Sequence, residues 1–244
     1  MTPLREERQG EKTKEASRAF WGFEDLALFL GAILPAWLVG SLLVRFGQTL
    51  APGAFSNSAV RTLAFQSTIY ALLIGALYMV ITFRYRRPLW QSMGWVVPER
   101  GAWWCVFGGP ALAIALSALG VVLRAPAIPT PVEGLISGRG TLWLVAFFAV
   151  VLGPLFEELL FRGFLLPLLQ RVLGAWTAIL LTAVGFALLH GSQYQWYWQD
   201  LLVVGLAGVA FGYARYKTGS TAAGALLHGG YNLALFVGYL IQSR

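Results

Sequence analysis

The chain contains only two histidines, His190 and His228, and each lies in strongly apolar sequence. Glu157 lies near the middle of a third apolar stretch, and Asn232 follows His228 by four residues. Ionisable side chains in such segments are costly to bury and are candidates for a functional site. A carboxylate, two imidazoles and a carboxamide are sufficient to activate a water molecule and to stabilise an oxyanion. We therefore take these four residues as the candidate catalytic residues.

A bracing ion pair is predicted beside Glu157. Glu158 and Arg162 are four residues apart, so on a helix they face each other and neutralise both charges in an apolar setting. This pairing favours a structural role for both of them rather than a chemical one. Glu157 is rotated by about 100° from its neighbour on a helix. It can therefore point into a cavity while the pair braces the helix behind it.

The two histidines repeat this spacing with other partners. Phe186 precedes His190 by four residues, so its ring can line the helix face from which the imidazole projects. His228 and Asn232 lie on one face of the last apolar stretch for the same reason. Taken singly, each histidine and Asn232 can also be explained by an interhelical hydrogen bond, which is common in membrane bundles. Their combination with Glu157 favours a catalytic site.

The composition predicts the class of protein that must position these residues. Hydrophobic residues make up 57% of the chain and charged residues 12%, with a mean hydropathy of +0.65. Soluble domains carry about a quarter charged residues, so this composition predicts an all-α, polytopic transmembrane helix bundle with its active site within the membrane. The net charge of +7 suits contact with an anionic lipid bilayer. The chain has no long basic stripe, so nucleic acid is not expected as a partner.

Apolar stretches bounded by charges, glycine, proline or aromatic residues predict about seven to eight spans. The seven apolar stretches are residues 26–44, 62–83, 102–123, 141–169, 175–198, 201–213 and 220–241. The sixth stretch is short for a bilayer, and Pro154 and Gly191 are candidate helix breaks. Residues 1–20 are predicted to be a charged arm, and residues 21–244 a single transmembrane domain with the catalytic motifs in 141–244.

The distribution of basic residues predicts the orientation in the cell membrane. The larger group, expected on the cytoplasmic side with the amino terminus, is Arg5, Arg8, Lys12, Lys14, Arg18, Arg84, Arg86, Arg87, Arg100, Arg171, Arg215 and Lys217. A cleaved signal peptide is not expected, because the first apolar stretch is too long for one. At 1.5 Å per residue, Glu157, His190 and His228 all lie roughly 15 to 25 Å from the cytoplasmic boundaries. Three helices are therefore expected to place polar side chains at a similar depth in the membrane.

Together the three patterns resemble the motifs of the CPBP family, the CAAX prenyl protease type II and bacteriocin-processing (ABI) membrane proteins. The patterns are Glu157-Glu158-x-x-x-Arg162, Phe186-x-x-x-His190 and His228-x-x-x-Asn232. They occur in the family's order within the carboxy-terminal half of the chain. The resemblance implies an intramembrane endopeptidase that acts on membrane-associated or lipidated proteins. It also implies that Glu157 and His190 activate the catalytic water, and that His228 and Asn232 hold the oxyanion.

The resemblance leaves the cofactor and the substrate open. Family members have been called metalloproteases, and zinc bound through Glu157, His190 and His228 would have the usual three protein ligands and a water molecule. A metal-free mechanism with glutamate-activated water explains the same residues. Prenylated carboxy-terminal peptides, bacteriocin leaders and the cytoplasmic ends of single-span proteins all fit as substrates. A non-catalytic peptide-binding scaffold and a proton-coupled transporter are the alternatives, although the chain shows no inverted repeat of the kind transporters have.

Overall fold

The structure, a computed structural model, describes residues 19–98, 102–128, 134–136 and 138–242, and its regular elements there are all helical. Most of the predicted arm, residues 1–20, lies outside the described residues. The all-α prediction is confirmed. The helices in chain order are α2 (Phe23–Leu50), α3 (Pro52–Phe55), α4 (Ser58–Met79), α5 (Leu89–Ser92), α6 (Ala102–Val122), α8 (Arg139–Phe147), α9 (Gly153–Glu158), α10 (Leu166–Leu173), α11 (Ala175–Leu189), α12 (Trp198–Thr218) and α13 (Thr221–Gln242). The π-helical turns are η1 (Val80–Arg84), η2 (Phe148–Leu152) and η3 (Leu159–Leu165).

Five helical segments of the described residues are long and apolar enough to cross a bilayer, and the protein is a multi-pass membrane protein. These segments are Phe23–Leu50, Ser58–Arg84, Trp104–Val122, Gly140–Leu173 and Thr221–Gln242. They correspond to five of the seven predicted stretches. The other two, α11 and α12, are respectively a shorter apolar helix and a longer one that carries charged residues near both ends.

The predicted ends of α11 and α12 are wrong. Helix α11 ends at Leu189 rather than at 198, and the chain then turns back on itself with positive φ angles at Gln195 and Trp196. The break predicted near Gly191 is therefore observed. Helix α12 has 21 residues rather than the predicted 13 of 201–213, because it continues until Gly219 adopts a left-handed conformation with φ of 67°. Glycine adopts this conformation without a steric penalty.

The break predicted at Pro154 does not occur. Segments α8, η2, α9, η3 and α10 follow one another without a gap, so the helix runs through the proline. Proline has no N–H to donate. The chain accommodates this with the wider turn η2, where the N–H of Gly153 bonds to the carbonyl of Phe148. Such π-helical turns are frequent at functional sites, and a second one, η3, begins directly after Glu158.

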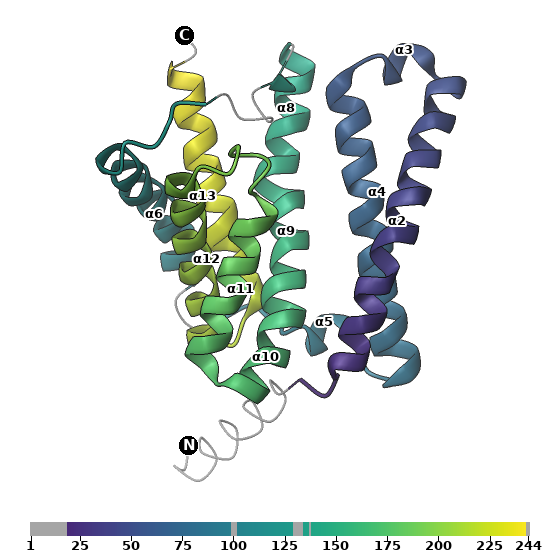
Figure 1. The fold of residues 1–244 in the computed structure, drawn as a ribbon, viewed down its shortest axis with the longest axis vertical. Coiled ribbons are helices and arrows are strands. Elements are labelled where there is room, and N and C mark those ends of the chain that lie inside the picture. Colours follow the sequence, from purple (N-terminus) through teal and green to yellow (C-terminus); the bar gives the residue numbers. More distant parts are fainter. Residues whose placement is uncertain (1–18, 99–101, 129–133, 137, 243–244) are drawn as a thin grey trace.

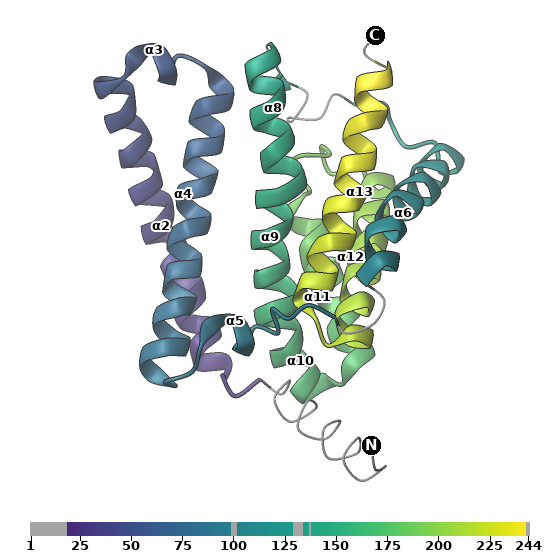
Figure 2. The same cartoon turned by 180° about the vertical axis from the view of Figure 1, so that it is seen from behind.

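Helix α13 lies centrally in the bundle, between α6 on one side and α9 on the other (Figures 1 and 2). Helices α11 and α12 pack side by side, and the hairpin of α2 and α4 stands at the opposite edge from α6. A side chain at Gly109 of α6 would place its Cβ 2.5 Å from the carbonyl oxygen of Leu227. The absence of a side chain there lets α6 and α13 approach closely.

The beginning of α2 lies beside the ends of η1 and α10 at one end of the bundle. Arg171 donates a hydrogen bond to the carbonyl of Ala19 at 3.0 Å. Arg84 pairs with Glu24 at 2.7 Å and with Asp25 at 3.3 Å. Arg84 and Arg171, which were both assigned to one side of the membrane, therefore lie at one end of the bundle. That this end faces the cytoplasm stays a prediction.

Candidate active site

The four candidate catalytic residues line one cavity of about 370 Å³. Glu157 comes from α9, His190 follows α11, and His228 and Asn232 lie on α13. Phe186 of α11 lines the same cavity. Residues that are far apart in the sequence are thus brought to one place, as the common depth of the three motifs predicts.

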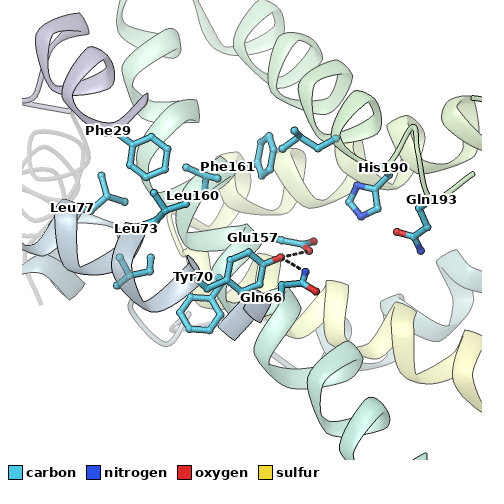
Figure 3. A pocket seen from close by; sticks show the side chains of 13 residues that line it. Phe29, Gln66, Tyr70, Leu73, Leu77, Glu157, Leu160, Phe161, His190 and Gln193 are labelled. Atoms are coloured by element: carbon cyan, nitrogen blue, oxygen red, sulfur yellow. Dashed lines mark hydrogen bonds between the residues drawn. The ribbon is translucent and has the colours of Figure 1, made fainter. Parts of the chain in front are cut away.

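A second cavity of about 190 Å³ extends from this site toward α2 and α4 (Figure 3). Its walls toward these two helices are mainly apolar and include Phe29, Leu73 and Leu77. Glu157 and His190 line both cavities. The carboxylate and the imidazole therefore lie where the two cavities meet.

The predicted pair of Glu158 and Arg162 is present and fully buried. Nη1 of Arg162 lies 2.8 Å from Oε1 of Glu158, and both side chains have an exposed fraction of 0%. Nη2 of Arg162 donates to the carbonyl of Gly208 on α12 at 2.7 Å. The guanidinium also lies over the rings of Phe186 and Phe211, at 5.0 and 5.4 Å from their centroids. The pair therefore ties the helix that carries Glu157 to α12.

His228 contacts both glutamates. Its Nδ1 lies 3.1 Å from Oε1 of Glu158, and its Nε2 lies 3.9 Å from Oε2 of Glu157. Its ring stacks on Phe211 at 4.4 Å. Because a carboxylate only accepts hydrogen bonds, Nδ1 must carry a proton. Glu158 therefore also orients His228, a role that helical spacing within one segment cannot predict.

His190 is held by the end of its own helix. Its Nδ1 lies 2.8 Å from the carbonyl oxygen of Phe186, and the two rings contact each other at 4.5 Å. A carbonyl accepts a hydrogen bond, so Nδ1 carries the proton and Nε2 of the neutral ring is an acceptor. Figure 3 shows the imidazole projecting from the end of α11 into the cavity shared with Glu157. This geometry suits a residue that accepts a hydrogen bond from water.

Asn232 has a backbone partner that the sequence analysis did not predict. Its Nδ2 donates to the carbonyl of Ala149 at 2.7 Å. In a π-helical turn this carbonyl would receive the N–H of residue 154, which is a proline and has none. Asn232 therefore satisfies a carbonyl that Pro154 leaves without a donor. One N–H and the oxygen of its carboxamide stay available to the cavity.

Two further polar residues at the site were missed in the sequence. The hydroxyl of Tyr70 lies 3.2 Å from Oε1 of Glu157, and Nε2 of Gln66 lies 2.9 Å from that hydroxyl. Both belong to α4 (Figure 3). Their spacing of four residues inside an apolar stretch is the same signal that identified the other motifs.

The zinc site considered from the sequence, with Glu157, His190 and His228 as ligands, stays a prediction. Among the described residues, no group of three or more His, Cys, Asp and Glu side chains is placed to hold a metal ion. Nδ1 of each histidine faces an acceptor within the protein, an arrangement that metal-ligating histidines share because Nε2 is then the ligating nitrogen.

Gly224 on α13 packs closely against the buried pair of Glu158 and Arg162. A Cβ at this position would lie 2.8 Å from Oε2 of Glu158, whose other oxygen is held by Arg162 and His228. Gly224→Ala is expected to lower the melting temperature in detergent, although alanine normally stabilises a helix by roughly 0.5–1 kcal/mol relative to glycine. Gly238→Ala on the same helix is the control, since its Cβ would meet nothing within 4 Å. Equal melting temperatures for the two variants would contradict this packing.

Residues 139–234 match the model of the family described as Type II CAAX prenyl endopeptidase Rce1-like. This part of the chain is therefore similar to the CPBP family of membrane proteases. The matched residues contain all three motifs, so the resemblance stated from the sequence is confirmed. The chain is also 30% identical over 99 residues to the UPF0177 protein YbdI of Lactococcus lactis subsp. lactis (strain IL1403).

That alignment covers 41% of this chain and 51% of the relative, so the chain spans about half the length of this curated protein. No solved structure matches the chain. The CPBP match thus extends over the helices that line the cavity from α8 to α13. It does not include α4, which carries Tyr70 and Gln66.

Proposed function

We propose that this protein is an intramembrane endopeptidase that hydrolyses peptide bonds of membrane-associated or lipidated proteins. The observation that carries the proposal is the single cavity lined by Glu157, His190, His228 and Asn232. A bundle that needed only interhelical hydrogen bonds would not have to bring a carboxylate, two imidazoles and a carboxamide to one cavity. These groups are what the hydrolysis of an amide requires.

Glu157 and His190 are the proposed activators of water. Nε2 of His190 and a carboxylate oxygen of Glu157 can both accept hydrogen bonds from one water molecule where the cavities meet. The water oxygen attacks the peptide carbonyl carbon, and its proton passes to Glu157. When the C–N bond breaks, that proton is delivered to the departing amine, which leaves a carboxylic acid and an amine as products.

His228 and Asn232 are the proposed donors to the oxyanion. Asn232 has one N–H left after its bond to Ala149. His228 can donate from Nε2 only as an imidazolium, because its Nδ1 proton is directed at Glu158. The buried charges balance in that state, since Arg162 and His228 are then positive while Glu157 and Glu158 are negative.

The substrates proposed are those with an apolar group beside the scissile bond. The cavity toward α2 and α4 is largely lined by Leu, Ile and Phe side chains, which suits a lipid group or an apolar peptide side chain. Prenylated carboxy-terminal peptides, bacteriocin leaders and the ends of single-span proteins all meet this requirement. We propose the cell membrane as the location, with the amino terminus in the cytoplasm.

The purified protein should cleave members of a panel of membrane-anchored peptides without bound zinc. We expect substoichiometric zinc by elemental analysis and a turnover that a chelator leaves unchanged. About one zinc per chain, with activity lost on chelation and restored by zinc, would contradict the metal-free mechanism. Binding of a panel peptide without any cleavage would favour a scaffold instead.

A further inference from the structure

We propose that Tyr70 is a positioning residue that fixes the carboxylate of Glu157, and that Gln66 in turn directs the hydroxyl of Tyr70. This inference rests on the role proposed above for Glu157. Both residues come from α4, outside the region that matches the CPBP family. The hairpin of α2 and α4 would then contribute to catalysis as well as lining a cavity.

The direction of the hydrogen bonds supports this inference. A tyrosine hydroxyl has one proton to donate and can also accept. The N–H of Gln66 donates to the hydroxyl oxygen of Tyr70 at 2.9 Å, so the hydroxyl proton is free to be donated to Oε1 of Glu157, 3.2 Å away (Figure 3). Gln66 therefore selects the orientation of the Tyr70 hydroxyl that serves Glu157.

The ring of Tyr70 is held in place by two phenylalanines near Glu157 on the same helical segment. It stacks on Phe148 at 6.1 Å with an interplanar angle of 9°, and it contacts Phe156 at 4.9 Å. Contacts from two aromatic rings restrict the movement of the tyrosine ring. The hydroxyl consequently has a fixed position relative to the backbone of Glu157.

A fixed donor matters because Glu157 is the less buried of the two glutamates. Its side chain is 20% exposed, whereas that of Glu158 is 0% exposed. A glutamate in a cavity can rotate about its terminal bonds unless a partner holds it. With Oε1 bound to Tyr70, Oε2 faces Nε2 of His228. Tyr70 thereby keeps the carboxylate in the orientation that the proposed attack on the substrate needs.

Tyr70→Phe removes the hydroxyl and keeps the ring between the two phenylalanines. Because a misplaced catalytic group costs up to about 10²-fold in rate, we expect kcat to fall about 10-fold to 100-fold. KM and the melting temperature should stay near those of the wild type. Gln66→Ala should lower kcat less. The double variant should be no slower than Tyr70→Phe alone, since both changes act on one hydroxyl.

Tyr78→Phe is the matched control, because Tyr78 lies two turns further along α4 with 48% of its surface exposed. It should keep the wild-type kcat. A wild-type kcat in Tyr70→Phe, a raised KM with unchanged kcat, or full additivity with Gln66→Ala would each overturn the inference. If Glu157→Gln is inactive while Tyr70→Phe is fully active, only the positioning role fails. If Glu157→Gln is active, the proposed function fails as well.

Discussion

Glu157→Gln is expected to lower the rate of peptide cleavage by about 10²- to 10⁴-fold, the usual contribution of a general base. The carboxamide has nearly the same shape and can still accept the hydrogen bond from Tyr70, but it cannot take a proton from water. The variant should therefore insert and fold as the wild type does. Steady-state turnover of a membrane-anchored peptide, together with the melting temperature in detergent, measures both properties.

Glu24→Gln is the control for this substitution. The side chain of Glu24 is 81% exposed, and that of its partner Arg84 is also exposed to solvent. The control should retain both turnover and stability, because exposed ion pairs contribute little. Near-wild-type turnover in Glu157→Gln would remove the catalytic interpretation of the whole cluster.

Arg162→Met is expected to destabilise the fold by about 3–5 kcal/mol, because it leaves a buried carboxylate without its cation. Glu158 would then keep only His228 as a partner, and the carbonyl of Gly208 would lose the hydrogen bond from Arg162. Methionine retains much of the volume between the rings that contact the guanidinium. Chemical denaturation in detergent, followed by tryptophan fluorescence, measures the free energy of unfolding.

The matched control is Arg84→Met, which breaks an ion pair whose arginine side chain is 45% exposed. It should cost only about 0–1 kcal/mol. The double variant of Glu158→Gln and Arg162→Met should recover part of the stability lost in Arg162→Met, because no buried charge is then unpaired. An Arg162 variant as stable as the Arg84 variant would show that the buried pair does not brace the helix.

Features that depend on a single helix or on composition could be predicted from the sequence. Long apolar stretches with few charges predict a helical membrane bundle, because backbone groups in lipid must be paired and a helix pairs them within one segment. The pairing of Glu158 with Arg162 and the contact of Phe186 with His190 follow from a spacing of four residues on a helix. The family resemblance followed from the same residues.

Which helices meet, and through which atoms, could be learned only from the folded structure. His228 contacts Glu158, Asn232 reaches Ala149, and Tyr70 reaches Glu157, each across two segments far apart in the chain. Such contacts depend on how the helices cross and on how close their backbones come.

The helix boundaries that the sequence analysis missed have the same cause. Pro154 predicts a break in the helix that carries Glu157, yet the helix continues through it. The wider turn η2 accommodates the proline, which has no N–H, and Asn232 of another helix donates to the carbonyl of Ala149. Helix α11 ends at Leu189, where the chain turns back toward α12, and this places His190 where the two cavities meet. Local propensity cannot predict these outcomes, since the groups that decide them come from elsewhere in the chain.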